Sequence, residues 1–166
     1  GFHLAEHIPF ADLQVLVAEA LRVLMPGGLL LLETPNPENI VVGTTRFYLD
    51  PTHQRPIPPQ LLSFLPEYYG FKRVKILRLQ ESVGLSNGRV PTLLDVLNGV
   101  SPDCAVVAQK EATPERMRLF DSVFEMNYGI SLETLSEHYE TRMATAEMKA
   151  RQAEAGLNAI YSSLSW

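Results

Sequence analysis

The sequence contains few of the residues and segments that mark several common protein classes. Cys104 is its only cysteine, which excludes a disulfide framework and a cluster of thiolate metal ligands. Its 14 basic residues are outnumbered by 19 acidic ones, and the net charge of −5 gives no electrostatic basis for nucleic-acid binding. No apolar run approaches the roughly 20 residues that span a bilayer, and the first residues lack the pattern of a signal peptide. We therefore expect a cytoplasmic protein with no membrane span and no nucleic-acid partner.

One stretch, residues 21–39, organises the rest of the chain. It contains the end of an amphipathic helix, a stop at Pro26-Gly-Gly28, the apolar run Leu29–Leu32 and a polar loop. Pro26 cannot continue a helix, and the two glycines allow the backbone angles of a tight turn. Because Leu29–Leu32 does not alternate with polar residues, we expect a strand covered on both faces, as in a parallel sheet flanked by helices.

Apolar spacing and turn residues predict the remaining elements. The stretch from Pro35 to Pro66 holds seven of the twelve prolines, which indicates an ordered loop without regular structure, and long ordered loops are usually functional. Cys104 stands in an apolar run that is typical of a buried strand with an inert thiol. We expect strands over 29–34, 73–79 and 104–108, and helices over 12–24, 58–69, 92–100, 114–127 and 132–164.

Polar residues follow the first of these strands, and ligands bind beyond the carboxyl ends of the strands in open α/β sheets. Asn36, Glu38 and Asn39 are therefore candidates for substrate binding, although polar turn residues would have the same composition. Tyr48, further along the proline-rich segment, is a candidate for the wall of the same pocket.

The segment Asp50-Pro-Thr-His53 brings a carboxylate and an imidazole together. A carboxylate can orient a histidine and raise its basicity, which would make His53 a general base with Asp50 as its partner. An Asx or Ser/Thr turn beside an exposed histidine explains the same residues. The sequence leaves both interpretations open.

The segment His3-Leu-Ala-Glu-His7 matches the H-x-x-E-H string of one class of metallopeptidases. That chemistry needs a helix, so that residues four apart point at one zinc ion. Here Ile8-Pro9 follows at once, a strand end is expected before it, and no other strong ligand set lies nearby in the sequence. We therefore predict a loop that caps the next helix or bonds to the backbone, and no metal site.

Taken together, several of these segments resemble the carboxyl-terminal half of Rossmann-like S-adenosylmethionine-dependent methyltransferases. The string Arg22-Val-Leu-Met-Pro-Gly-Gly28 before a buried strand is fairly specific to them, and Glu6-His-Ile-Pro9 and the polar loop through Asn39 are similar as well. The continuation from Phe47-Tyr-Leu-Asp-Pro-Thr-His53 to Gly70-Phe71 resembles a subgroup associated with bacterial surface-polysaccharide assembly. The resemblance covers residues 2–110 well and residues 111–166 loosely.

The resemblance implies an α/β fold: a partial Rossmann-like methyltransferase sheet with an antiparallel last strand over residues 1–112, then a coiled-coil-like helical extension over 113–166. It implies methyl transfer from S-adenosylmethionine to a sugar or polysaccharide hydroxyl, with Glu6 and His7 beside the methionine portion of the cofactor. It also implies other surface-polysaccharide assembly proteins as partners. The family's glycine-rich cofactor loop is missing from these 166 residues. We therefore expect further sequence upstream and little cofactor binding by this chain alone.

The last segment carries its own pattern. From Leu132 to Leu164 apolar residues recur in alternating steps of three and four, with one repeated four, which indicates the a/d seam of a coiled coil. Such a helix would be about 50 Å long, so we expect a homodimer through residues 132–164. The alternative is a helix that wraps the open face of the sheet. A non-catalytic module for self-association or docking is the alternative to an enzyme.

Overall fold

A computed structural model of the chain describes residues 1–85 and 87–164. Three strands, β1 (Leu29–Pro35), β2 (Arg73–Leu79) and β3 (Asp103–Gln109), form one sheet in the order β1-β3-β2, and β3 is antiparallel to both neighbours. This confirms the expected sheet and its antiparallel last strand. The expected strand end at the start of the chain is present only as one parallel bridge, from Phe2 to Glu33.

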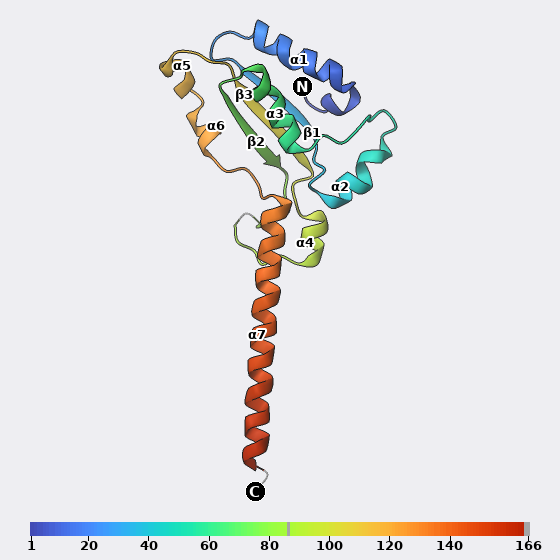
Figure 1. Ribbon diagram of the computed structural model, residues 1–166, viewed down its shortest axis with the longest axis vertical. Coiled ribbons are helices and arrows are strands. Elements are labelled where there is room, and N and C mark those ends of the chain that lie inside the picture. Colours follow the sequence, from blue (N-terminus) through green and yellow to red (C-terminus); the bar gives the residue numbers. More distant parts are fainter. Residues whose placement is uncertain (86, 165–166) are drawn as a thin grey trace.

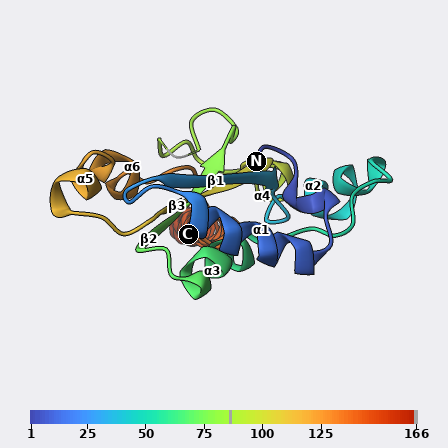
Figure 2. The same cartoon turned by 90° about the horizontal axis from the view of Figure 1, so that it is seen from above.

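Two helices, α1 (Phe10–Val23) and α3 (Pro59–Tyr69), cover the same face of the sheet (Figure 2). Leu32 is fully buried beneath them, whereas Leu29–Leu31 are only half-buried. Leu30 still packs against the core on the helix side, but Leu29 and Leu31 alternate to the face that these two helices leave open. The expectation that both faces of this strand are covered is therefore wrong. The main core consists of Ala5, Leu13, Val17, Leu32, Ile57, Leu62, Leu65, Phe71, Val106 and Ala108.

The end of α1 is held by Lys110, the residue that directly follows β3. α1 stops at Val23, as Pro26 requires. The Lys110 ammonium then donates hydrogen bonds to the carbonyls of Leu21 and Leu24, at 2.6 and 2.7 Å. These are carbonyls that a helix end leaves without partners, and a cation there also complements the helix dipole. The turn before β1 is thereby tied to the end of β3.

The proline-rich segment is more regular than its composition suggests. It contains α2 (Ile40–Thr44) and a short 3-10 helix, η2 (Arg46–Leu49), so the expectation of a loop without regular structure is wrong there. Asn39 caps α2, because its side-chain oxygen accepts a hydrogen bond from the Val42 amide at 3.1 Å. Phe47 of η2 is almost fully buried. The cap of Asn39 therefore fixes α2, and the burial of Phe47 fixes η2. A similar 3-10 turn, η1 (Ala5–His7), stands where a plain loop was expected.

The expected helix over 114–127 is divided into α5 (Pro114–Arg118) and α6 (Asp121–Glu125). Arg73 of β2 explains the break. Its guanidinium donates hydrogen bonds to the Met117 carbonyl and to Asp121, and it lies 4.3 Å from the centre of the Phe124 ring. The Met117 carbonyl also accepts from the Phe120 amide at 3.3 Å, whereas in a continuous α-helix it would accept from the amide of Asp121.

A second, smaller core holds the base of the last helix. α4 (Leu93–Asn98) and α7 (Leu132–Leu164) meet over Leu85, Val100, Ile130 and Leu135. Beyond this contact α7 projects away from the sheet as a straight rod (Figure 1), and every residue from 140 to 164 is exposed. α7 therefore does not wrap the sheet. No helix in the described part of the chain is both long and apolar enough to cross a bilayer.

Cys104 lies in the middle strand of the sheet. It is fully buried, and burial raises the pKa of its thiol to about 12. The expected packed thiol in a buried strand is confirmed. Of the expected helical extension, residues 165 and 166 lie outside the described part of the chain.

Gly129 fixes the approach of α7 to the sheet and gives a test of this packing. Its φ is +64°, and a Cβ there would lie 2.5 Å from Arg78 Cβ and 2.9 Å from Ser101 Oγ. Gly129→Ala should lower the free energy of unfolding by about 2–5 kcal/mol, from left-handed strain plus overpacking. Gly88→Ala is the matched control, since Gly88 has a φ of +82° but nothing within 4 Å of its Cβ. Urea denaturation should show a loss of only about 1–2 kcal/mol for the control, and equal losses would contradict the packing.

Candidate functional site

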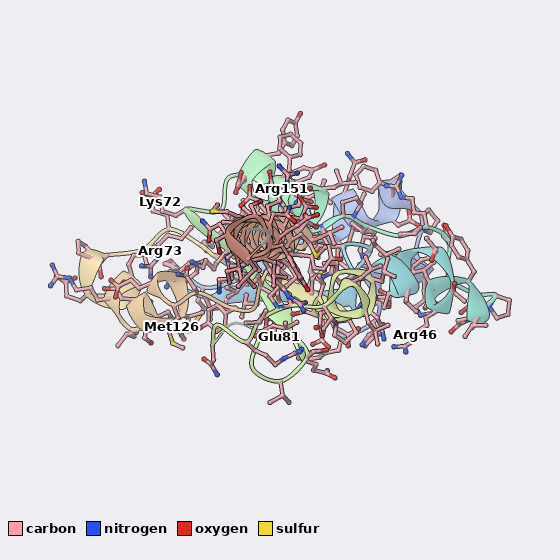
Figure 3. The ribbon with its side chains drawn as sticks, turned by 90° about the horizontal axis from the view of Figure 1, so that it is seen from below. Arg46, Lys72, Arg73, Glu81, Met126 and Arg151 are labelled. Atoms are coloured by element: carbon pink, nitrogen blue, oxygen red, sulfur yellow. The ribbon has the colours of Figure 1, made fainter. Side chains whose placement is uncertain are left out.

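The candidate site lies at the edge of the sheet where β1 and β2 end and β3 begins. Pro35 of β1 and Leu79 of β2 both pair with Asp103, the first residue of β3. This is the edge that the strand-end rule selects for ligands. Figure 3 looks along α7 and labels Arg46 on the α2 side of the body, opposite Lys72 and Arg73 at the start of β2.

The turn η1 brings Glu6 and His7 to this edge. Gln54 holds the turn by donating from its backbone N–H to the Glu6 carbonyl at 2.8 Å and from its side-chain amide to the His7 carbonyl at 2.9 Å. Glu6 itself is fully buried. One of its oxygens, Oε1, lies 3.1 Å from His3 Nδ1, and Oε2 has no hydrogen-bond partner among the described residues.

His53 comes from the proline-rich segment and faces the same turn. Its Nδ1 donates to the Phe47 carbonyl at 2.6 Å, because a carbonyl can only accept. In the neutral imidazole this leaves the lone pair on Nε2. The ring lies 4.6 Å from the His7 ring and 4.4 Å from the Phe47 ring, centre to centre. Its side chain is 12% exposed, so His53 is an ordered residue that a ligand can still reach.

Asp50 accepts hydrogen bonds from Thr52, and Thr52 in turn contacts His7. Its Oδ1 accepts hydrogen bonds from the Thr52 hydroxyl at 2.6 Å and the Thr52 amide at 2.8 Å, and these bonds hold the pKa of Asp50 below its ordinary range. The Thr52 oxygen also lies 2.9 Å from His7 Nδ1. Since the only hydroxyl proton goes to Asp50, His7 Nδ1 must be the donor in that contact.

The expected pairing of Asp50 with His53 is present only as a charge contact, and the turn that was its alternative forms between Asp50 and Thr52. Asp50 Oδ2 lies 3.9 Å from His53 Nε2, which is too far for a hydrogen bond. The Phe47 carbonyl orients His53 instead, and Asp50 orients His7 through Thr52. The sequence signal for Thr52 was its place in an Asp-Pro-Thr-His turn, whereas nothing local indicated the roles of Gln54 or the Phe47 carbonyl.

The two candidate asparagines are part of the framework. Asn36 donates to the Ser101 carbonyl at 2.9 Å and accepts from the Glu38 amide, and Asn39 donates to the Val100 carbonyl at 2.7 Å besides capping α2. Both are fully buried. They fasten the loop after β1 to the segment that enters β3, and their contact with a substrate stays a prediction.

Glu38 and Tyr48, the other two candidates for substrate binding, differ in exposure. Glu38 accepts two hydrogen bonds from Arg78, at 2.7 and 2.9 Å, and one from Gln60 at 3.1 Å. Burial disfavours its charged form, but the hydrogen bonds and charge of Arg78 outweigh that cost and lower the pKa of Glu38. Tyr48 is 64% exposed, with its ring edge against Phe47, and is free to meet a ligand.

The structure therefore brings Glu6, His7 and His53 together, with one donor atom from each within 4.8 Å of the others. A cavity of about 180 Å³ opens beside His53 and is lined by Pro35, Val42, Arg46, Phe47, His53, Pro102 and Asp103. Glu6, His7 and Asn36 are not among these lining residues. Burial raises the pKa of Asp103, partly offset by the charge of His3.

The described residues fit only one flank of an S-adenosylmethionine site. Glu6 and His7 lie at the end of the segment that bridges to β1, on the opposite side of that strand from β3. The sequence has no glycine-rich strand–loop–helix element to hold the rest of the cofactor. The residues present do not form a complete cofactor cradle.

Comparison with known proteins supports the fold. No family model matches the sequence, and no curated protein matches it. Among solved structures, the chain is similar to a SAM-dependent methyltransferase from Archaeoglobus fulgidus, with a TM-score of 0.56 and 26% sequence identity over 66% of this chain. The chain spans 57% of the length of that protein. The mixed α/β body with its small antiparallel sheet is thus consistent with a partial methyltransferase-like fold.

The Glu38–Arg78 pair predicts a pH-dependent contribution to stability. Because the folded-state pKa of Glu38 lies below the ordinary 4.5, its contribution is complete above that value and is lost as pH falls through the lowered pKa. Glu38→Gln should lower the free energy of unfolding by about 1.5–3 kcal/mol at neutral pH. Urea denaturation across a pH series should show that difference shrinking below pH 4.5.

Glu111→Gln is the control for this measurement. Glu111 pairs with Lys72 at 3.0 Å, but both side chains are more than half exposed. The substitution should therefore change the free energy of unfolding by less than about 1 kcal/mol at any pH. A Glu38→Gln effect that persists undiminished in acid would show that the charge is not responsible.

Proposed function

We propose that this chain forms the methyl-acceptor side of a SAM-dependent methyltransferase that acts on a hydroxyl group, in the first instance of a sugar or polysaccharide. The fold likeness to the Archaeoglobus fulgidus methyltransferase carries the proposal. The hydroxyl is supported by the sequence resemblance to enzymes of surface-polysaccharide assembly, whose other proteins are the partners we propose. A cytoplasmic location belongs to the same proposal.

His53 is the residue we propose as proton acceptor. A hydroxyl is a weak nucleophile unless its proton is removed, and a positioned imidazole is suited to that task near neutral pH. The Phe47 carbonyl fixes the tautomer that leaves Nε2 free. Asp50 Oδ2, 3.9 Å from Nε2, stabilises the imidazolium by charge once the proton has arrived.

The other candidates take places around His53. Glu6 and His7 face the methionine portion of S-adenosylmethionine, which supplies the methyl group when bound. Tyr48, exposed beside Phe47, forms an outer wall of the acceptor pocket. Asn36, Glu38 and Asn39 hold the loop on which this pocket is built, through their bonds to Ser101, Arg78 and Val100.

The exposed face of α7 favours a second function, self-association. We propose that residues 1–112 are the methyltransferase-like body, that residues 113–166 are a helical extension, and that residues 132–164 of this extension join two copies. Along the predicted seam Met143, Leu157, Ile160 and Leu164 are between 41% and 74% exposed. A monomer would leave this apolar stripe in water, whereas a second α7 would cover it, with Ala146, Ala150 and Ala153 allowing close approach.

His53→Ala tests the catalytic proposal. In the protein that joins this chain to a cofactor-binding half, the substitution should lower the methylation rate by about 10²–10⁴-fold, the usual contribution of a general base. Cofactor affinity, measured by calorimetry, should stay nearly the same. His138→Ala is the control, because His138 is exposed on α7. Unchanged turnover in His53→Ala would remove His53 from the reaction.

Ala150→Glu tests the association of α7. The added carboxylate would be buried in the seam of the dimer, so sedimentation velocity should show the dimer dissociating while circular dichroism of the body is preserved. Gln152→Glu adds the same charge two residues later, off the seam, and should leave the dimer intact. Wild-type chain that sediments as a monomer at micromolar concentration would disprove the proposal.

A further inference from the structure

The cluster of Glu6, His7 and His53 has the composition of a metal site. A carboxylate oxygen and one ring nitrogen from each histidine lie within 4.8 Å of one another. Two of these residues come from the turn η1 and the third from a segment 46 positions further along the chain. Two imidazoles and one carboxylate suit borderline divalent ions such as Zn²⁺ and Fe²⁺, in sites that keep positions open for water or substrate.

Both histidines are already in the tautomer that a metal ligand requires. His53 Nδ1 donates to the Phe47 carbonyl, and His7 Nδ1 donates to Thr52, whose own proton goes to Asp50. Each ring is therefore held through Nδ1, and each Nε2 keeps its lone pair. Metal-binding histidines almost always have such an outer partner, and the chain Asp50–Thr52–His7 is a carboxylate-supported version of it.

Glu6 supplies an independent observation. Its side chain is fully buried, and while Oε1 contacts His3, Oε2 has no hydrogen-bond partner among the described residues. An unsatisfied buried carboxylate oxygen is costly. A cation held between Glu6 and the two imidazoles would provide the missing interaction.

We propose that Glu6, His7 and His53 bind one divalent transition-metal ion, with the two histidines coordinating through Nε2. Tetrahedral coordination at about 2.1 Å places donor atoms roughly 3.4 Å apart, so ligand atoms that now lie within 4.8 Å of one another approach by at most about 1.4 Å on binding. Of the three proposed ligands, His53 alone borders the 180 Å³ cavity. This proposal departs from the sequence expectation that the chain holds no metal site.

A neighbouring cluster of similar composition carries no such proposal. His3 lies 3.6 Å from Glu33 and 4.0 Å from Asp103, with its side chain 47% exposed. There the imidazole faces two carboxylates, and no unpartnered oxygen of Glu33 or Asp103 is buried among the described residues. Glu33 is therefore a suitable control, an acidic residue beside the site but outside the ligand set.

Metal binding by this cluster does not depend on the proposed reaction. A metal would occupy the Nε2 lone pair that a general base needs, and it would instead lower the pKa of a hydroxyl bound at an open position. This activation of a hydroxyl by the metal rests on the proposed function, whereas the binding of the metal does not. A chain that binds no metal leaves His53 available as a base, and a chain that binds metal without any methylation leaves the site intact.

The experiment is a titration of the purified, chelator-treated chain with Co²⁺, followed by its visible d–d absorption, and with Zn²⁺ by calorimetry. We expect one ion per chain, an intense tetrahedral-type Co²⁺ spectrum and displacement of Co²⁺ by Zn²⁺. Glu6→Gln and His53→Gln should each weaken affinity by more than about 100-fold. Thr52→Val keeps all three ligands and should weaken it by about 10–100-fold through the lost support of His7.

Glu33→Gln and His138→Gln are the controls and should bind as the wild type does, and circular dichroism verifies that each variant is folded. The proposal is overturned if the wild-type chain binds no ion. It is equally overturned if Glu6→Gln and His53→Gln bind normally, or if Glu33→Gln loses binding as they do. Should Glu6→Gln fail to fold, His53→Gln and Thr52→Val still decide the outcome.

Discussion

The pairing of β3 with β1 on one side and β2 on the other determines where every other part of the molecule lies. Its residues from Cys104 to Gln109 are all buried, and both neighbours run in the opposite direction. The ends of β1 and β2 therefore meet the start of β3 at one edge. The connections that follow β1 and the segment that enters β3 therefore lie at the same end of the sheet.

The segment that enters β3 fastens two separate features to that edge. Its carbonyls at Val100 and Ser101 bind the amides of Asn39 and Asn36, which fixes the loop after β1 and the start of α2. Val100 also belongs to the small core beneath α7. The start of the proline-rich segment is thus fixed. The loop that carries His53 is held by the bond from His53 to the Phe47 carbonyl and by the bond from Gln54 to the His7 carbonyl. Residues that looked like ligands in the sequence turn out to build the frame for residues that face the cavity.

Local patterns predicted the elements that depend on local chemistry. The bounds of α7 follow from apolar spacing alone, and α3 ends at Gly70 as its sequence requires. Two of the errors involve contacts between distant residues. Arg73 interrupts the helix over 114–127 from 44 residues away, and Thr52 reaches His7 across 45. No periodicity or turn signal contains such pairs, so the sequence indicated Asp50 and His53 as candidates but not the link from Asp50 through Thr52 to His7.

The string His3-Leu-Ala-Glu-His7 shows why a motif has to be judged by the backbone that carries it. On an α-helix its two histidines would share a face, but here the 3-10 turn covers only Ala5–His7 and leaves His3 outside it. The same turn directs the adjacent residues Glu6 and His7 toward His53, a ligand set that the motif does not describe. Whether His53 accepts a proton or binds a metal, it needs Nδ1 protonated and Nε2 free. The Phe47 carbonyl enforces this tautomer in both cases, so the chemistry of the edge depends on the anchoring of a buried phenylalanine as much as on the histidine itself.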